Sequence, residues 1–303
     1  MTDLNLPNVD IALGFTIPER HARGRFVRMG PVLDGILSKH AYPPAIEKLL
    51  AEALTLTALI GSTLKDAGGQ LTLQTQSETG VVRLLVCDYK GGEVRGYVEF
   101  DPDRLAGAPA DPTLFALFGA AYLTITFDQA LTGERYQGIV PLDGDTLAQA
   151  VESYFVQSEQ LPTLVRVGLR KDDDGRCVVG GLFLQHLPEG EEGRDRIHTR
   201  LDHPEWQHVE ALGATIEPDE LTDSAATLET LIWRLFNEEE EVRVLTTLPL
   251  SRGCRCTPDY IAQVIAKFPV EERRAMADEN GVITVDCAFC ATKFPLMVDD
   301  MAA

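Results

Sequence analysis

The chain has 303 residues, of which 45% are hydrophobic and 24% charged, as in ordinary globular proteins. Its 47 acidic residues outnumber its 27 basic ones, giving a net charge of −20 that disfavours DNA or RNA as a partner. The most apolar run, residues 53–64, is too short to cross a bilayer, and residues 1–18 lack a secretion signal. We therefore expect a cytoplasmic protein of two domains, or of one domain with a sizeable appendage, with no membrane partner.

The chain begins with a segment, residues 1–21, that predicts an extended arm, and residues 23–29 predict a strand with alternating basic residues. Pro44 then starts a helix whose apolar residues recur at helical spacing as far as Leu64. This pattern predicts one buried face, with scaffold rather than ligand-binding character. Asp145 is predicted to cap a further helix that runs to about Glu159.

Alternating apolar and polar residues between short turn sequences predict antiparallel strands. The predicted strands are 70–76, 81–88, 96–100, 122–128, 135–140, 163–171 and 176–185. Asp172–Gly175 is predicted to be a hairpin turn. Cys87 and Cys177 lie inside such strands among apolar residues, so we interpret each as a small buried hydrophobe without a redox role. The sequence thus predicts an α+β domain of roughly 185 residues, in which helices pack on antiparallel sheets.

The composition changes after Pro188. Residues 189–205 are rich in charge and poor in apolar groups, which disfavours independent folding. Amphipathic pieces at 205–216 and 226–236 predict two helices that must pack on a neighbouring part of the protein. We expect Trp206 and Trp233 to lie in these docked linker helices. His186, His198, His203 and His208 are interpreted as solvated or capping groups, with a second metal site as the alternative.

Two tight cysteine pairs, Cys254/Cys256 and Cys287/Cys290, lie near the end of the chain. Four thiolates are the ligand set of a closed tetrahedral zinc site. Cysteines this close in sequence can also form disulfides within each pair, and a small Cys-x-Cys ring should be easily reduced. The spacing alone leaves two hypotheses open, namely a permanent zinc staple and a redox switch.

The segment that carries these cysteines predicts a small domain with few apolar residues. Thr257 and Pro258 start a helix, residues 270–278 form a second one, and residues 283–294 form a hairpin that carries Cys287 and Cys290. About 60 residues with so small a core do not fold robustly alone. Removal of zinc is therefore expected to unfold this domain.

No nucleotide-binding, hydrolase or metalloprotease motif occurs in the chain, so we expect no enzymatic activity and no catalytic residues. Two alternatives remain. One is a zinc-ribbon nucleic-acid-binding module, which the charge of −20 disfavours. The other is a thiol oxidoreductase using Cys287 and Cys290, although such pairs usually start a helix after a strand.

At these residues the chain resembles the redox-regulated heat shock protein 33 family. Gly253-Cys254-Arg255-Cys256 and Cys287-Ala288-Phe289-Cys290 look like the two zinc-binding motifs of that family. Tyr154–Thr163 and Arg23–Arg28 resemble segments of its N-terminal domain. The resemblance covers essentially the whole chain, with one small departure at Phe294, where many members are expected to have tyrosine.

The resemblance implies an ATP-independent chaperone, a holdase, that binds unfolding client proteins under oxidative stress. In the reduced, inactive state Cys254, Cys256, Cys287 and Cys290 would bind one zinc ion. Oxidation would form the disulfides Cys254–Cys256 and Cys287–Cys290, release zinc, unfold the linker and expose a client-binding surface. Members of the family dimerise when active, so a homodimer is expected in the oxidised state.

The sequence and the resemblance together predict three parts. Residues 1–188 would form the N-terminal α+β chaperone core, residues 189–240 a charged and partly helical metastable linker, and residues 241–303 the C-terminal zinc-binding redox-switch domain.

Overall fold

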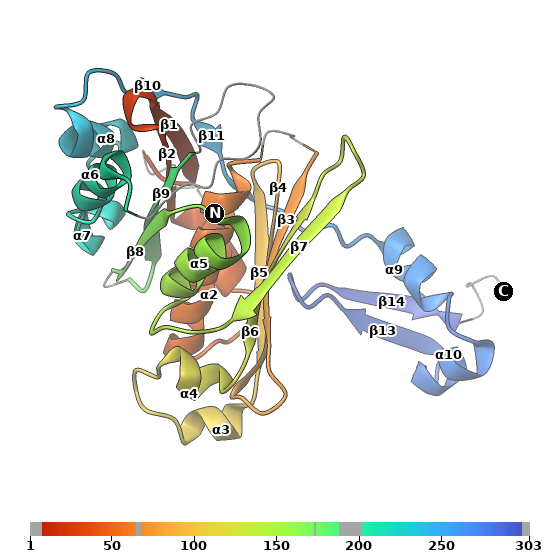
Figure 1. Cartoon of the computed structure of the whole chain (residues 1–303). Helices are drawn as coiled ribbons and strands as arrows, with labels where there is room; N and C mark the ends of the chain where they lie inside the picture. The colour runs from red at the N-terminus through yellow and green to blue at the C-terminus, as the bar shows by residue number, and fades with distance from the viewer. Residues whose placement is uncertain (1–7, 65–67, 173, 188–201, 299–303) are drawn as a thin grey trace.

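The structure is a computed structural model that describes residues 8–64, 68–172, 174–187 and 202–298. Two six-stranded sheets form the body, one helix runs between them, three helices cover the first sheet, and a small C-terminal module projects from the body (Figure 1). The predicted α+β class is therefore confirmed. The prediction about residues 189–201 lies outside the described residues.

The first sheet, here called sheet A, has the strand order β10-β1-β2-β9-β8, and β11 also pairs with β1. Its neighbouring strands are antiparallel. The strands are β1 (Ile11–Ile17), β2 (Ala22–Met29), β8 (Thr163–Lys171), β9 (Cys177–His186), β10 (Arg243–Val244) and β11 (Leu248–Pro249).

The second sheet, sheet B, has the strand order β12-β5-β4-β3-β6-β7. All pairs are antiparallel except β12 with β5, which run parallel. The strands are β3 (Gln70–Gln76), β4 (Val82–Lys90), β5 (Glu93–Phe100), β6 (Tyr122–Asp128), β7 (Arg135–Pro141) and β12 (Ser251–Arg252). Strands predicted in this region thus exist, with small shifts at their ends.

Helix α2 (Pro44–Gly61) forms the centre of the main core, because it contacts strands of both sheets. Every residue from Ala53 to Gly61 is buried, so the predicted single buried face is wrong. Burial on all sides is tolerated because Thr55 and Thr57 donate their hydroxyl hydrogen bonds to backbone carbonyls four residues earlier, at 2.8 and 2.7 Å.

Smaller helices complete the body: α1 (Pro31–Leu37), α3 (Pro102–Ala106), α4 (Leu114–Phe118) and α5 (Leu147–Tyr154), with a 3₁₀ turn at Pro18–Arg20 and a π-helical turn at Phe155–Glu159. The sequence did not predict α3 and α4, which are only five residues long. The cap of α5 is Thr146 and not Asp145, since the Thr146 hydroxyl accepts a hydrogen bond from the backbone N–H of Gln149.

The described part of the predicted extended arm, residues 8–21, is built into sheet A. Strand β1 pairs with β2 along its whole length and is buried on both faces. The connection between them is a 3₁₀ turn of three residues, and His21, which ends it, has a left-handed conformation. So short a turn gives too weak a sequence pattern to be predicted. The predicted turn before β9 is confirmed, with Gly175 at φ +80°.

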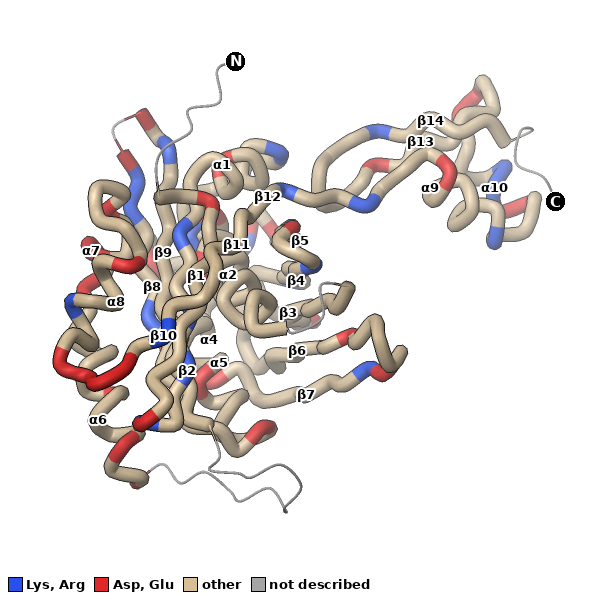
Figure 2. Tube along the Cα trace, turned by 90° about the horizontal axis from the view of Figure 1, so that it is seen from above, with Lys and Arg blue, Asp and Glu red and all other residues tan. Residues whose placement is uncertain are grey.

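Three helices, α6 (Pro204–Gly213), α7 (Pro218–Thr222) and α8 (Leu228–Phe236), lie on the outer face of sheet A. We call them the cover. The C-terminal module follows, with α9 (Pro258–Ile265), α10 (Val270–Met276) and the hairpin β13 (Val282–Asp286) and β14 (Lys293–Met297). It projects from the body in both Figure 1 and Figure 2.

Candidate metal centre and its surroundings

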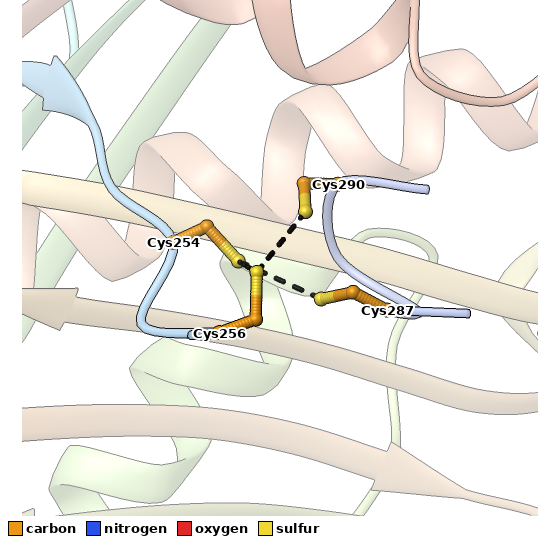
Figure 3. Close-up of side chains that lie close together, drawn as sticks. All are labelled: Cys254, Cys256, Cys287 and Cys290. Carbon is orange, nitrogen blue, oxygen red and sulfur yellow. Dashed lines mark hydrogen bonds between the residues drawn. The ribbon is translucent and has the colours of Figure 1, made fainter. Parts of the chain in front are cut away.

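Four thiols converge where the C-terminal module meets the body. Cys254 and Cys256 follow β12, and Cys287 and Cys290 lie in the loop between β13 and β14 (Figure 3). The predicted hairpin therefore carries its two cysteines as expected. All four sulfur atoms lie within 4.8 Å of one another, and no other such group of metal-ligating side chains occurs in the described ranges.

The distances suit a tetrahedral metal site. The Sγ atom of Cys256 lies 3.2 Å from that of Cys254 and 3.4 Å from that of Cys290, and Cys254 Sγ lies 3.6 Å from Cys287 Sγ. Four sulfurs bound to one zinc ion at about 2.3 Å would be roughly 3.8 Å apart. A metal ion could thus bind after movements of only a few tenths of an ångström.

The loop that carries Cys287 and Cys290 is a tight turn. The N–H of Cys287 donates to the carbonyl of Thr292 at 2.9 Å, and the N–H of Ala291 donates to the carbonyl of Cys287 at 2.8 Å. Ala291 has φ +55°, the left-handed conformation that lets the chain turn back. Both sulfurs consequently face the Cys254–Cys256 segment. The pair follows a strand but starts no helix, unlike the usual oxidoreductase arrangement.

The thiols differ in acidity. Burial raises the pKa of Cys256, and hydrogen bonds with neighbouring thiols raise it further. Burial also raises the pKa of Cys287. At Cys290 burial acts in the same direction, but hydrogen bonds with Thr292 and with the other thiols lower the pKa to about 6. Four neighbouring thiolates repel one another, so a bound cation would favour the state in which all four are ionised.

The centre lies against sheet B through specific contacts. Phe289 packs edge-on against Tyr97, with ring centroids 5.0 Å apart, and the Arg95 guanidinium lies 4.0 Å from the Phe289 ring centroid. Arg255 donates to the side-chain oxygen of Gln70 at 2.6 Å, and His40 Nε2 lies 2.9 Å from the carbonyl oxygen of Ala288. The thiol centre is thus held between the module and the body.

The module itself has a very small core. Ile265, Ile283 and Val298 are its buried cluster, and Phe294, the position of the expected tyrosine, is also buried. Helix α9 begins as predicted, because the Thr257 hydroxyl accepts a hydrogen bond from the N–H of Tyr260. So few apolar contacts leave the thiol centre as the main element that could tie α9 to the hairpin.

The cover hides an apolar face of sheet A. Trp206 is only 1% exposed and packs in this second core, which confirms that the first linker helix is docked. Trp233 lies, as predicted, on a docked helix, α8, but its side chain is 67% exposed. The buried sheet residues are Leu13, Phe15, Ile17, Ala22, Phe26, Leu164, Leu182 and Leu184.

A polar cluster joins the edge of the cover to the start of the chain. Arg20 pairs with Glu205 and, at 2.7 Å, with Glu239, which also lies 2.7 Å from His208 Nε2. The Glu239 side chain is only 4% exposed. Burial opposes its ionisation, but the bonds to Arg20 and His208 outweigh this effect and lower its pKa. Acidic residues 238–241 follow α8 directly (Figure 2).

The histidine predictions have mixed outcomes. His186 is buried, with its ring centroid 4.9 Å from that of His203 and 6.1 Å from Trp206, so a solvated role is wrong for it. His203 does cap α6, since its Nδ1 accepts from the N–H of Glu205 at 3.3 Å. His198 lies outside the described residues. Cys87 and Cys177 are buried thiols, as expected.

Sequence reasoning missed the contacts between distant segments. Arg95, Tyr97 and Gln70 meet the cysteine loops, and Arg20 meets Glu239, across about 185 to 220 positions of sequence. The sequence indicated these contacts only through residue type, since arginine and aromatic residues often form such contacts. The described residues contain no helix that is long and apolar enough for a membrane span.

Comparisons with known proteins agree with this architecture. A crystal structure of the 33 kDa chaperonin (heat shock protein 33 homolog) of Thermotoga maritima superposes with a TM-score of 0.77, covers 96% of each chain and is 22% identical, which supports the fold. The 33 kDa chaperonin of Caulobacter vibrioides is 39% identical over 294 residues, covering 95% of this chain and 94% of that protein. That of Pseudomonas putida KT2440 is 33% identical over 299 residues, covering 98% and 94%.

The fold and the relatives thus define the class of protein as a molecular chaperone. The family model described as Hsp33 protein matches residues 10–296, and this chain belongs to that family. The four-cysteine cluster fits the metal-binding and redox properties expected of it.

Proposed function

We propose that this protein is a redox-regulated, ATP-independent holdase that binds unfolding client proteins under oxidative stress. The observation that carries the proposal is the cluster of four sulfurs within 4.8 Å at the base of a module whose described residues give a buried cluster of only three. A module that depends on its thiols loses its fold when they are oxidised.

Cys254, Cys256, Cys287 and Cys290 are the proposed ligands of one zinc ion in the reduced state. The set fits zinc because all four donors are thiols and converge at nearly tetrahedral spacing. Zinc when bound neutralises the thiolates and links residues 254–256 to the β13–β14 loop. Phe289 lies between Cys287 and Cys290 in the chain. Its contacts with Tyr97 and Arg95 therefore orient the cysteine loop toward sheet B.

The proposed oxidised state contains the disulfides Cys254–Cys256 and Cys287–Cys290. Peroxide is the oxidant: each pair of thiolates loses two electrons and one S–S bond forms. The O–O bond of one peroxide molecule breaks and, with two protons from solvent, gives two water molecules. Sulfurs of different pairs lie nearly as close, at 3.4 and 3.6 Å against 3.2 Å for Cys254 and Cys256, so the proposed pairing rests on the family resemblance.

The connection between the module and the cover suggests how oxidation acts at a distance. From α8 the chain passes through β10 and β11 on sheet A and then through β12 on sheet B before it reaches Cys254. Strands of two residues each are weakly held. Unfolding of the module would therefore loosen this connection and with it the cover, which exposes the apolar face of sheet A as the client-binding surface.

The proposal includes the division into residues 1–188, 189–240 and 241–303, a homodimer in the oxidised state and a cytoplasmic location. It includes neither an enzymatic activity nor a nucleic-acid or membrane partner. The interface of the proposed homodimer would have to overcome the repulsion between two chains that each have a net charge of −20.

The test follows zinc and client binding together. The reduced protein is treated with peroxide, released zinc is measured with a chromogenic chelator, and light scattering follows an unfolding client protein without ATP. We expect about one zinc per chain to be released on oxidation and client aggregation to stop, with both effects reversed by reductant and zinc. Zinc that stays bound while clients aggregate would contradict the switch. Disulfide mapping by mass spectrometry of the oxidised chain tests the two pairs.

A further inference from the structure

Arg28 is a completely buried arginine on β2, at 0% exposure, and its guanidinium points into the cover. It donates hydrogen bonds to the backbone carbonyls of Leu221 at 2.8 Å and Ala226 at 2.7 Å, and a longer one of 3.3 Å to Glu220. A further contact of 3.4 Å reaches the carbonyl of Asn8. In the described part of the chain no carboxylate lies within ion-pair distance of this guanidinium. Its partners are therefore main-chain carbonyls, two of them in α7 and one, Ala226, just before α8.

The positions of these carbonyls explain why one side chain can hold two helices. Glu220 and Leu221 lie in the last turn of α7, where helix carbonyls lack partners in the helix, and Ala226 directly precedes Thr227, the cap of α8. The planar guanidinium has donors that point in several directions, so it can bond to both segments. Its positive charge also interacts favourably with the C-terminal end of α7. Arg28 thus joins the end of one cover helix to the start of the next.

The sheet beside Arg28 is shaped to let α7 approach. Gly180 is the register partner of Arg28 on β9, and Gly168 is the partner of Gly180 on β8. A Cβ atom at Gly168 would lie 2.3 Å from the carbonyl oxygen of Pro218, and one at Gly180 would lie 2.1 Å from that of Leu221. The backbone of α7 therefore rests directly on the strands, which places its carbonyls within reach of the guanidinium.

We propose that Arg28 is the positioning residue that holds residues 218–228 on sheet A and so sets how readily the cover opens. Burial lowers the pKa of Arg28 to about 10, with Asp223 opposing this effect, so the side chain stays charged at neutral pH. The anchoring role rests on the structure alone. Its consequence for client binding rests on the proposed function.

The main test replaces Arg28→Lys in the full-length, reduced and zinc-loaded protein. Lysine keeps the charge but cannot bond to separate carbonyls in the same planar geometry. Hydrogen–deuterium exchange of the α7 and α8 amides should become on the order of 10- to 100-fold faster, as expected when hydrogen bonds to a charged group are lost. Exchange in sheet B and zinc content should stay unchanged. Equal exchange of α7 and α8 in the variant and the original protein would overturn the proposal, as would equal loosening of the whole body.

Arg23→Lys is the matched control on the same strand. Arg23 faces away from the cover and bonds to the side-chain oxygen of Gln185, with an Nε–Oε1 distance of 3.0 Å. Its replacement should leave exchange of the α7 and α8 amides unchanged. Faster exchange in both variants would show that general loss of arginine contacts, and not the Arg28 anchor, opens the cover.

A second measurement needs no substitution and applies even if Arg28→Lys fails to fold. The Nε–H of Arg28, observed by NMR in the ¹⁵N-labelled protein, should exchange as slowly as the buried amides of α8 and lose protection together with them on oxidation. An Nε–H that exchanges orders of magnitude faster than those amides would overturn the anchor. Client binding is measured separately: an open cover in Arg28→Lys without client binding would contradict the proposed surface and leave the anchor intact.

Discussion

The two ends of the molecule are held together by different means. In the body, α2 is buried between two sheets, and apolar packing alone can stabilise the fold. In the C-terminal module the buried cluster is Ile265, Ile283 and Val298, while four thiols meet at one point. A region held by ligands can be released by chemistry that leaves an apolar core untouched. The cover lies between these extremes, with its own apolar core but only weak strands leading to the module.

The largest effect is expected when the thiol centre is broken. Cys287→Ser removes one of the four proposed ligands, and structural zinc contributes about 10–16 kcal/mol to folding of small zinc domains. We expect loss of stoichiometric zinc and rapid proteolysis between residues 254 and 298 under reductant, with the body intact. Cys177→Ala, at a buried thiol outside the centre, is the control and should keep its zinc. A protease-resistant module in Cys287→Ser would contradict the four-ligand site.

The next effect concerns the cover and should be seen through one tryptophan. Trp206 is buried and Trp233 exposed, so a red shift of emission on oxidation or heating should come from Trp206. Trp233→Phe should keep the shift, and Trp206→Phe should abolish it and destabilise the cover by roughly 1–3 kcal/mol. Fluorescence spectra of both variants make the comparison. A shift that survives in Trp206→Phe would show that the cover does not open at α6.

A smaller effect is expected from pH. In the folded protein, the hydrogen bond from Arg20 lowers the pKa of Glu205. At Glu239 burial raises the pKa, but hydrogen bonds from Arg20 and His208 outweigh burial, so the pKa of this group is also lowered. Their contribution to docking is therefore complete above the unfolded pKa of about 4.3 and is lost as pH falls through the lower folded values. Trp206 emission in Trp233→Phe should shift in this range.

Arg20→Gln is the control for the pH effect, because it removes the shared partner of both carboxylates. The variant should dock more weakly near pH 7 and show a shallower loss on acidification. An identical pH profile in the two proteins would assign the acid effect to other carboxylates.

The smallest effect should come from the contact between the module and sheet B. Arg95→Lys keeps the ion pair with Asp88 but weakens the stacking on Phe289, which is worth about 0.5–1 kcal/mol. We expect slightly faster hydrogen exchange in residues 287–292 with zinc still bound. Arg83→Lys, at an exposed arginine that pairs with Glu99 and Asp101, is the control. No difference between these variants would exclude the Arg95–Phe289 contact as a docking element.

Much of the fold could be predicted because its signals are local. Alternation at Gln70–Gln76 and Tyr122–Asp128 gave strands with the observed bounds, and Thr257-Pro258 gave the start of α9. The thiol cluster followed from the spacing of four cysteines and from their geometry in a hairpin loop. Elements of two to five residues, such as α3, α7 and β10, escaped because short segments have weak periodic signals.

The sequence by itself determined the class of fold and the metal-ligand candidates, and it predicted that the C-terminal segment depends on more than an apolar core. These properties depend on residue type and on spacing within one segment. Only the tertiary structure decided that Trp206 is buried and Trp233 exposed, that Arg28 bonds to the cover, and that Phe289 rests on Arg95. Such contacts join residues far apart in the chain, so their geometry exists only after the sheets and helices have packed.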